Sequence, residues 1–250
     1  MQRLILINVV AFAVQLILNV PFGQGFGGLN DPAPGGLFTR YLHFDAALFF
    51  GGFVYMPISY QFLHASLSHL FWNMLMLYFF GPTVEREYGT RRFYTFYLWC
   101  GAAGVLATLL PVLLGAPLAR MAPVVGASGA IMGVLVAFAL SDLERRLYFL
   151  FVPFPINARA LLIIVLALNL LPALLGGGAD VSILTHLGGM GAGYLFVKLA
   201  PRVEGVRIRL PQFKRREKRA ADPGGAPKGH TDKVGKAVDN IFKFNDKRRR

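Results

Sequence analysis

Six apolar segments alternate with polar or glycine-rich stretches along the chain. By residue number they are 4–20, 67–80, 93–114, 128–140, 158–175 and 181–200. Such segments are candidates for membrane-spanning helices, because a helix needs about 20 mainly apolar residues to cross a bilayer. The pattern predicts an all-α membrane protein, a bundle of six transmembrane helices.

The first apolar segment carries three side-chain amides on one side. Asn8, Gln15 and Asn19 are spaced by seven and four residues. This spacing places them on one helix face, which we expect to point at other helices rather than at lipid. A secretory signal peptide is the alternative, because Arg3 precedes the apolar run. The run is long for a signal peptide and no clear cleavage site follows it, which favours a retained helix.

Residues 21–62 form a long connection that begins rich in glycine and proline and then becomes aromatic. Its aromatic part carries Phe38, Tyr41, Phe44, Phe49, Phe50, Phe53 and Tyr55. Aromatic residues at this density beside Arg40 and Asp45 indicate a loop at the membrane interface or partly embedded in it. An ordinary extracytoplasmic loop is the alternative.

Composition and charge placement support a membrane protein with a defined orientation. The chain is 55% hydrophobic and 16% charged, with a mean hydropathy of +0.51, which is too apolar for a soluble domain. Residues 21–66 and 115–127 hold one basic residue each and residues 176–180 hold none, whereas the alternate connections are richer in arginine. Because Lys and Arg concentrate on the cytoplasmic side, this alternation predicts that both termini are cytoplasmic.

The composition changes abruptly after Ala200. Residues 201–250 hold 16 of the 26 Lys and Arg residues but 6 of the 13 Asp and Glu residues. We therefore expect a six-helix domain over residues 1–200 and a basic, mostly disordered cytoplasmic tail over residues 201–250. The tail is expected to anchor the topology, with contact between residues 214–219 and anionic lipid head groups as a sharper alternative. Nucleic-acid binding is not expected, because no folded basic domain accompanies the charge.

Three polar side chains fall at one depth in three different apolar segments. Helical rise of about 1.5 Å per residue puts Ser128 roughly 20 Å from the charged residues that end its segment. His186 stands twelve residues before Lys198, which gives about 18 Å. Asn73 stands twelve residues before Glu85, again about 18 Å. A bilayer core is about 30 Å thick, so all three side chains are expected inside it.

Glycine spacing predicts that two of these segments meet. The pairs Gly129–Gly133 and Gly189–Gly193 each have the small-xxx-small spacing that lets membrane helices approach closely. His186 lies on the same helix side as its glycine pair, so close packing would bring the imidazole toward Ser128.

These residue types together support nucleophilic catalysis. A neutral imidazole at His186 can take the hydroxyl proton of Ser128. No acidic residue is expected at that depth, so the arrangement would be a dyad. Asn73 can donate its amide to a developing oxyanion, with the backbone N–H of Ser128 as a second donor. His69, on the same helix face as Asn73, can do the same or hold a water.

Taken singly, these residues have ordinary structural explanations. A serine in a membrane helix usually bonds its own backbone, and a lone histidine usually satisfies a neighbouring helix. Their coincidence at one depth favours catalysis. Other chemistries lack their residues: the sequence has no His-Glu-x-x-His motif, no aspartate pair within the apolar segments, and a single cysteine, Cys100. We expect neither a metal nor another cofactor.

Several short motifs surround the candidate site residues. They are Gly126-Ala127-Ser128-Gly129, His69-x-x-x-Asn73, His186 followed by Leu-Gly-Gly-Met-Gly-Ala-Gly, Phe62-Leu63-His64, Glu85-Arg86 with Gly89, and Arg92-Phe93. With these motifs, residues 1–200 resemble the bacterial rhomboid serine proteases. The resemblance implies a six-helix rhomboid bundle in which Ser128 is the nucleophile, His186 is the general base, and His69 and Asn73 serve the oxyanion.

The resemblance also has implications for partners and location. It implies substrates that are single-pass transmembrane proteins, cut near a helix end that unwinds readily, and a place in the bacterial inner membrane. An embedded first loop and a mobile fifth helix would correspond to residues 21–66 and 158–175. A rhomboid-like pseudoenzyme that binds membrane helices without cutting them is the main alternative, and the presence of both Ser128 and His186 argues against it. A channel or transporter is a third hypothesis, which the scarcity of charge within the apolar segments disfavours.

Overall fold

A computed structural model describes residues 1–19, 37–118, 122–148, 153–172, 174–175 and 181–200. Contacts divide the chain into two units, Met1–Val206 and Arg207–Arg250, and all described residues belong to the first. The predicted tail, residues 201–250, lies outside the described residues. The connection between residues 20 and 36 also lies outside them.

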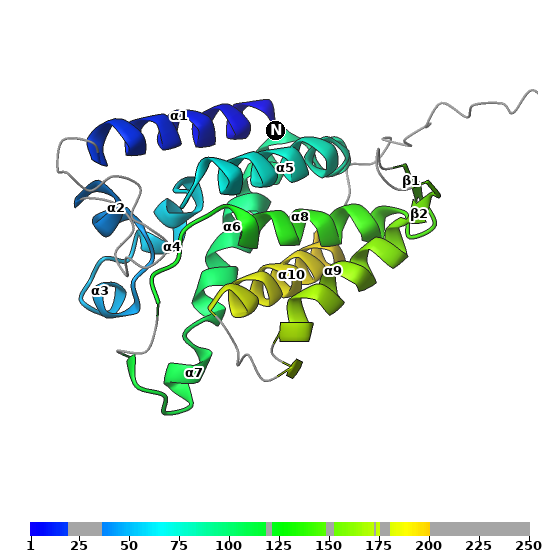
Figure 1. Cartoon of the computed structure of the whole chain (residues 1–250). Coiled ribbons are helices and arrows are strands. Elements are labelled where there is room, and N and C mark those ends of the chain that lie inside the picture. Colours follow the sequence, from blue (N-terminus) through cyan, green and yellow to red (C-terminus); the bar gives the residue numbers. More distant parts are fainter. Residues whose placement is uncertain (20–36, 119–121, 149–152, 173, 176–180, 201–250) are drawn as a thin grey trace, which may run out of the picture. The chain divides into compact units, whose positions relative to one another are not determined.

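Helices make up most of the described residues (Figure 1). The longer ones are α1 (Gln2–Asn19), α5 (Leu67–Tyr88), α6 (Thr90–Ala107), α8 (Ser128–Ser141), α9 (Ala158–Pro172) and α10 (Val181–Leu199). The shorter elements are α2 (Leu37–Leu42), α3 (Ala46–Phe50), α4 (Met56–Ser59), η2 (Tyr60–Phe62), α7 (Leu110–Leu113), β1 (Arg146–Leu147) and β2 (Ile156–Asn157). Of the helices in these described stretches, not one has both the length and the apolar character needed to cross a membrane.

Two helices end at places that the apolar pattern did not predict. The segment predicted over residues 67–80 continues as α5 to Tyr88 and stops only at Gly89, whose φ is +80°. The segment predicted over residues 93–114 divides into α6 and α7. The reason is Pro111, which stands in the first turn of α7, lacks an N–H and clashes with the carbonyl of the preceding helical turn.

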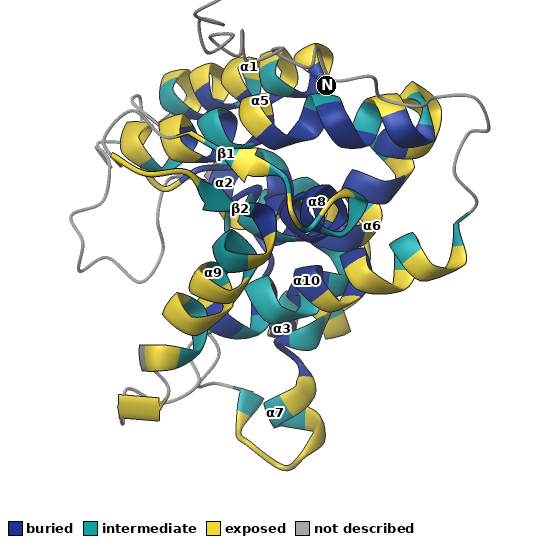
Figure 2. Ribbon diagram, turned by 90° about the vertical axis from the view of Figure 1, so that its right-hand side faces the viewer, coloured by how far each residue is buried: buried dark blue, intermediate teal, exposed yellow. Residues whose placement is uncertain are grey.

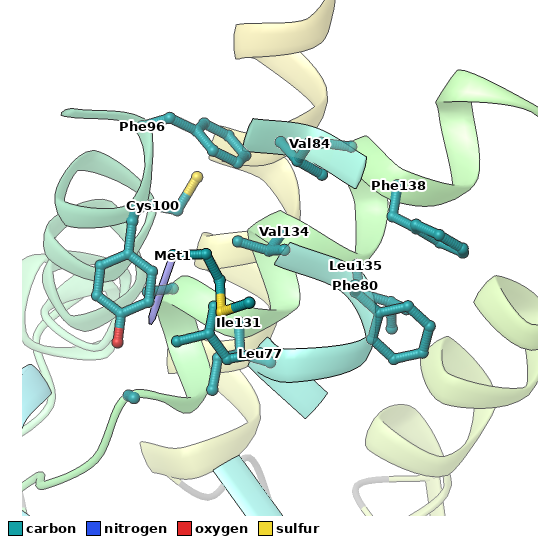
Figure 3. Close-up of a cluster of buried hydrophobic side chains, with 14 of the residues drawn as sticks. Met1, Leu77, Phe80, Val84, Phe96, Cys100, Ile131, Val134, Leu135 and Phe138 are labelled. Atoms are coloured by element: carbon teal, nitrogen blue, oxygen red, sulfur yellow. The ribbon is translucent and has the colours of Figure 1, made fainter. Parts of the chain in front are cut away.

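Helix α8 lies at the centre of the helical packing. It contacts α5, α6, α9 and α10, and ten of its 14 residues are buried. Figure 2 shows α8 dark blue and enclosed by the other helices, which carry more exposed surface. Side chains from α5, α6 and α8 interlock in the main core, as Figure 3 shows. Those labelled there from these helices are Leu77, Phe80, Val84, Phe96, Cys100, Ile131, Val134, Leu135 and Phe138.

Glycines bring α8 and α10 into backbone contact. A methyl group added at Gly193 would lie 2.6 Å from the carbonyl oxygen of Gly133, and one added at Gly189 would overlap the carbonyl oxygen of Gly129. Such distances leave no room for any side chain larger than hydrogen. The prediction that these glycine pairs let two helices approach closely is confirmed.

The amides of α1 point into the molecule. Asn8 and Gln15 are both buried. The Gln15 side chain donates to the carbonyl of His64 over 3.0 Å and accepts from the N–H of His64 over 3.1 Å. The prediction that this face of the first helix points at other parts of the protein is therefore confirmed for these two residues. The side chain of Asn19 lies outside the described part.

The start of α9 is fastened to the end of α8. Strands β1 and β2 pair antiparallel, and the backbone N–H groups of Ala158 and Arg159 donate to the carbonyls of Arg145 and Leu143. The Arg159 guanidinium also lies 2.6 Å from the Glu144 carboxylate.

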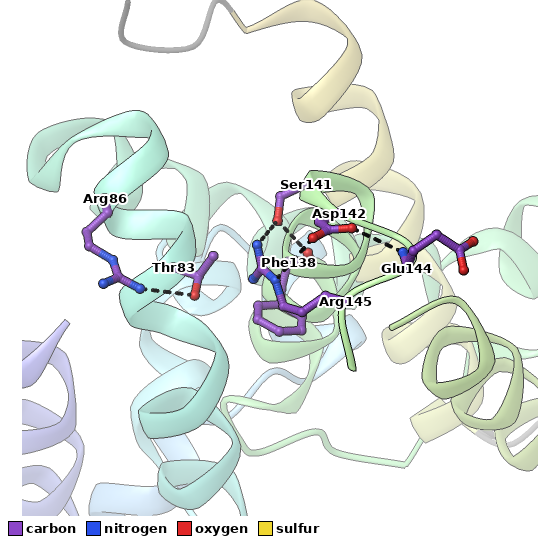
Figure 4. A network of polar contacts seen from close by, with 7 residues as sticks. All are labelled: Thr83, Arg86, Phe138, Ser141, Asp142, Glu144 and Arg145. Carbon is purple, nitrogen blue, oxygen red and sulfur yellow. Dashed lines mark hydrogen bonds and ion pairs between the residues drawn. The ribbon is translucent and has the colours of Figure 1, made fainter. Parts of the chain in front are cut away.

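A second set of contacts closes the end of α8 itself. Arg145 donates to the hydroxyl of Ser141, which in turn donates to the carbonyl of Phe138 (Figure 4). The Arg145 guanidinium carbon lies 4.8 Å from the centre of the Phe138 ring. These contacts tie the residues that follow α8 to its last turn.

Candidate active site

Ser128 is the first residue of α8, and a firmly held segment precedes it. The backbones of Val124 and Phe44 exchange two hydrogen bonds of 2.9 and 3.0 Å. The N–H of Gly126 donates to the carbonyl of Tyr60 over 3.0 Å, and the Tyr60 hydroxyl donates to the carbonyl of Gly101 over 2.6 Å. The connection over residues 37–62 thus supports the backbone that leads into the serine.

His186 on α10 meets Ser128. The imidazole Nε2 lies 2.9 Å from the Ser128 Oγ, within hydrogen-bonding distance, and both residues are partly buried. The two side chains are brought together because Gly129 and Gly189, near them in sequence, let α8 and α10 touch. A hydroxyl at this distance from an imidazole nitrogen can pass its proton to that nitrogen.

The other ring nitrogen of His186 faces a residue that was not among the predicted site residues. Asn169 on α9 places its Oδ1 2.6 Å from the His186 Nδ1, and its Nδ2 donates to the carbonyl of Val165 over 2.8 Å. The depth estimated from helical rise, which singles out the other site residues in the sequence, also singles out Asn169. Asn169 stands ten residues after Arg159, about 15 Å by helical rise, near the depth expected for Ser128.

Asn73 and His69 on α5 border the backbone just before Ser128. A methyl group built on Gly126 would lie 2.6 Å from the Cε1 of His69, 2.9 Å from its Nε2, and 3.8 Å from the Nδ2 of Asn73. Gly126 also has a φ of +120°, a conformation that residues with side chains rarely adopt. Both its conformation and its surroundings therefore require glycine.

These two α5 side chains offer hydrogen-bond donors. The Nδ2 of Asn73 is buried and has no hydrogen-bond partner among the described residues. The N–H of Ala65 faces the Nδ1 of His69 over 3.5 Å, at the outer limit of a hydrogen bond, and a neutral ring that accepts there carries its proton on Nε2. An amide N–H and an imidazole N–H thus lie beside the segment that carries the serine.

His64 lies next to this group, in the connection before α5. Its ring is fully buried and stands edge-on to the His69 ring, with 5.2 Å between the ring centres. Burial lowers the pKa of His64 to about 3, and the neighbouring His69 adds to the shift. His64 is therefore neutral at physiological pH.

No group of three His, Cys, Asp or Glu side chains in the described ranges is placed to hold a metal ion.

A family model for the rhomboid domain matches residues 52–202, well over half of the chain. The chain belongs to the rhomboid family. The match takes in every predicted site residue as well as Asn169. Members of this family are membrane proteins, and most are intramembrane serine proteases.

Named relatives agree with this membership. The chain is 39% identical over 88 residues to the rhomboid protease GluP of Bacillus subtilis, an alignment covering 35% of this chain and 16% of the relative. It is 37% identical over 92 residues to the mitochondrial presenilin-associated rhomboid-like protein of Bos taurus, covering 37% and 24%. It is 34% identical over 141 residues to the mitochondrial rhomboid protein 1 of Saccharomyces cerevisiae, covering 56% and 40%. The chain thus spans less than half the length of each of these relatives.

Proposed function

We propose that this rhomboid-family protein is an intramembrane serine endopeptidase with a Ser128–His186 dyad. The observation that carries the proposal is the 2.9 Å separation between the Ser128 Oγ and the His186 Nε2. Family membership supports it, since the relatives include a protein named as a rhomboid protease.

In the proposed reaction, His186 acts first as a base and then as an acid. Its Nε2 takes the Ser128 proton as the Oγ attacks the scissile carbonyl carbon, which gives a tetrahedral intermediate. The imidazolium then donates that proton to the leaving amine as the C–N bond breaks and the acyl-enzyme forms. Water, deprotonated by the same nitrogen, hydrolyses the ester and restores the serine.

The oxyanion of the intermediate needs donors, and we assign them to α5 and to the start of α8. The buried Nδ2 of Asn73 has no other partner among the residues described. The Nε2–H of His69 lies beside Gly126, two residues before the nucleophile. The backbone N–H of Ser128 is the third donor in this assignment. Donors fixed before the reaction stabilise developing charge without reorganising.

We also propose the membrane setting that the sequence predicts. The bundle of six longer helices is embedded in a bacterial inner membrane with both termini cytoplasmic, and the substrates are single-pass transmembrane proteins. The basic tail over residues 201–250 holds this orientation and contacts anionic lipid. The placement of Lys and Arg along the sequence supports this topology.

Covalent labelling tests the dyad. The purified protein in detergent should react with a fluorophosphonate probe at Ser128 and should cleave a model transmembrane substrate. Ser128→Ala, His186→Ala and the double variant should all lose about 10³-fold or more of the cleavage rate and lose labelling, because residues that act as a unit are not additive.

Ser141→Ala is the matched control for this experiment. Ser141 stands at the other end of α8, where its hydroxyl donates to the carbonyl of Phe138 over 2.7 Å. This variant should keep both labelling and turnover. Cleavage by Ser128→Ala at near the wild-type rate would end the serine-protease proposal, and a folded wild type that binds the substrate without labelling or cleaving would favour a pseudoenzyme.

The oxyanion donors are tested separately. Removing one donor of an oxyanion site typically lowers kcat by about 10²–10³-fold. Because the assigned donors partly replace one another, we expect Asn73→Ala to lose roughly 10-fold or more, and Asn73→Ala with His69→Ala to lose more than either alone. Unchanged turnover in both single variants would reject the assignment.

A further inference from the structure

A continuous line of hydrogen-bonding groups runs from the backbone of α9 to the hydroxyl of Ser128. The carbonyl of Val165 accepts from the Asn169 Nδ2 over 2.8 Å, and the Asn169 Oδ1 lies 2.6 Å from the His186 Nδ1. The His186 Nε2 lies 2.9 Å from the Ser128 Oγ. Three helices, α9, α10 and α8, contribute to this line.

The Val165 carbonyl determines which group donates and which accepts at each step of this line. A backbone carbonyl oxygen can only accept, so the Asn169 atom that faces it must be the NH₂ group. The Asn169 atom that faces His186 is then the carbonyl oxygen, which also can only accept. A hydrogen bond of 2.6 Å to that oxygen requires a proton on Nδ1. In the neutral ring, Nε2 is then unprotonated and faces the serine hydroxyl as an acceptor.

We propose that Asn169 is a positioning residue for His186 that fixes the reactive tautomer of the imidazole. The inference rests on the proposed function, because a general base must present an unprotonated Nε2 to the serine. Asn169 does not touch the reacting atoms and acts only through His186. The dyad predicted from the sequence thus has a third member, an amide in the place where many serine proteases have a carboxylate.

Asn169 makes one more hydrogen-bonding contact than a purely structural role in α9 would require. The bond from Nδ2 to the Val165 carbonyl satisfies the amide within its own helix, as polar residues in apolar helices often do. The contact between Oδ1 and the His186 Nδ1 is additional, and it joins two different helices. It also gives a hydrogen-bond partner to the Nδ1 of His186, the ring nitrogen that does not face Ser128.

Kinetics of variants at this position provide the first test. Loss of the residue that fixes the tautomer costs a serine protease up to about 10⁴-fold in kcat, and a neutral amide orients the ring less strongly than a carboxylate. We therefore expect Asn169→Ala and the similarly sized Asn169→Leu to lower kcat by about 10- to 100-fold while KM changes less than about twofold. Asn169→Asp should keep most of the turnover, because a carboxyl group offers Nδ1 an acceptor oxygen in either protonation state.

Leu170→Ala is the control for general damage to α9. Leu170 is the next residue along the helix and is also partly buried. This variant removes packing without touching the hydrogen bonds, so it should keep kcat. Equal losses in Leu170→Ala and Asn169→Leu, or no rescue by Asn169→Asp, would overturn the inference.

Nitrogen-15 NMR of the histidine rings provides a readout that is independent of turnover. Two-bond proton–nitrogen spectra distinguish Nδ1–H from Nε2–H imidazole, and comparison with His186→Gln assigns the ring. We expect wild-type His186 as the Nδ1–H tautomer, and a shift toward Nε2–H, the form that free histidine prefers, in Asn169→Leu. An unchanged tautomer in that variant overturns the inference, even if kcat falls. A wild type that shows the expected tautomer but neither labels nor cleaves would overturn the proposed function alone.

Discussion

Individual side chains around Ser128 show which parts of the site the sequence reveals and which it hides. Ser128, His186 and Asn73 are recognisable because each is a polar group inside an apolar segment at a measurable distance from charged residues. Asn169 has the same properties, yet its function depends on which nitrogen of His186 it faces. That pairing is set by the rotation of α9 about its own axis, and a single sequence does not fix such a rotation.

His64 predicts how stability depends on pH. Its pKa is lowered to about 3 in the folded protein by burial, against an ordinary value of 6.5. Between these two pKa values the unfolded chain binds more protons at His64 than the folded protein does. The contribution of a neutral His64 to the free energy of unfolding is therefore complete above about pH 6.5 and decreases as the pH falls toward 3. His43, also lowered by burial, contributes in the same direction.

The measurement is the Tm of the purified protein between pH 7 and pH 5, for the wild type and for His64→Leu. One proton taken up only on unfolding changes stability by at most about 1.4 kcal/mol per pH unit. We expect Tm to fall less steeply with decreasing pH in the variant than in the wild type. Parallel curves would show that His64 is not responsible.

At the scale of helices, apolar runs predict where a helix exists better than where it ends. Glu85 and Arg86 follow the apolar run of the second segment, but the helix continues to Tyr88, because charged residues such as these are good helix formers. The helix stops at Gly89, with a φ of +80°. In the third segment the hydrophobicity continues while Pro111 interrupts the hydrogen bonding. Helix ends are thus set by residues such as glycine and proline that change the backbone conformation, and the hydrophobic pattern does not show them.

The contact between α8 and α10 predicts a sharp difference between two glycines of one helix. A methyl group at Gly189 would overlap the Gly129 carbonyl oxygen, whereas a methyl group at Gly191 would have nothing within 4 Å. Gly189→Ala should therefore separate the helices, lower stability by about 1–3 kcal/mol or more, and reduce probe labelling by moving His186 away from Ser128.

Gly191→Ala should leave activity unchanged and should raise the helix propensity, by up to about 1 kcal/mol. Thermal unfolding and labelling measured on both variants provide the check. If Gly189→Ala were as stable and as reactive as Gly191→Ala, α8 and α10 would not be in the contact described.

At the scale of the whole molecule, the sequence predicts the order of the long helices in the described ranges but not their arrangement. The central place of α8, between α5, α6, α9 and α10, depends on contacts between segments far apart in the chain. The glycine pairs correctly indicate one of these contacts, since small residues have a geometric consequence that can be read from spacing alone. Packing of α8 against α5 depends on large apolar side chains such as Leu77, Phe80 and Phe138, and their types do not specify a partner.

Truncation tests the division of the chain into a catalytic part and a tail. Every residue assigned to the site lies within Met1–Val206. A protein ending at Gly205 should therefore cleave a detergent-solubilised substrate within about twofold of the full-length rate. A loss of 10-fold or more would show that the tail takes part in the reaction.

The tail's proposed lipid contact has its own measurement. Each basic residue near an anionic surface contributes about 1 kcal/mol of binding. A peptide of residues 201–250 should bind vesicles that contain anionic lipid and should bind neutral vesicles much more weakly. Equal binding to both would contradict the lipid contact.

Because α9 is bound to the end of α8 at its first turn, any tilt of α9 about that end displaces the residues farther along the helix most. Its first residues are held by backbone hydrogen bonds to Leu143 and Arg145 and by the ion pair between Arg159 and Glu144. Asn169 lies about 15 Å along the helix from Arg159, so a tilt of about 10° displaces it by roughly 2.6 Å. A displacement of that size, directed away from His186, would break the hydrogen bond between the Asn169 Oδ1 and the His186 Nδ1. The orientation of the imidazole therefore depends on the contacts that hold the first turn of α9 to the end of α8.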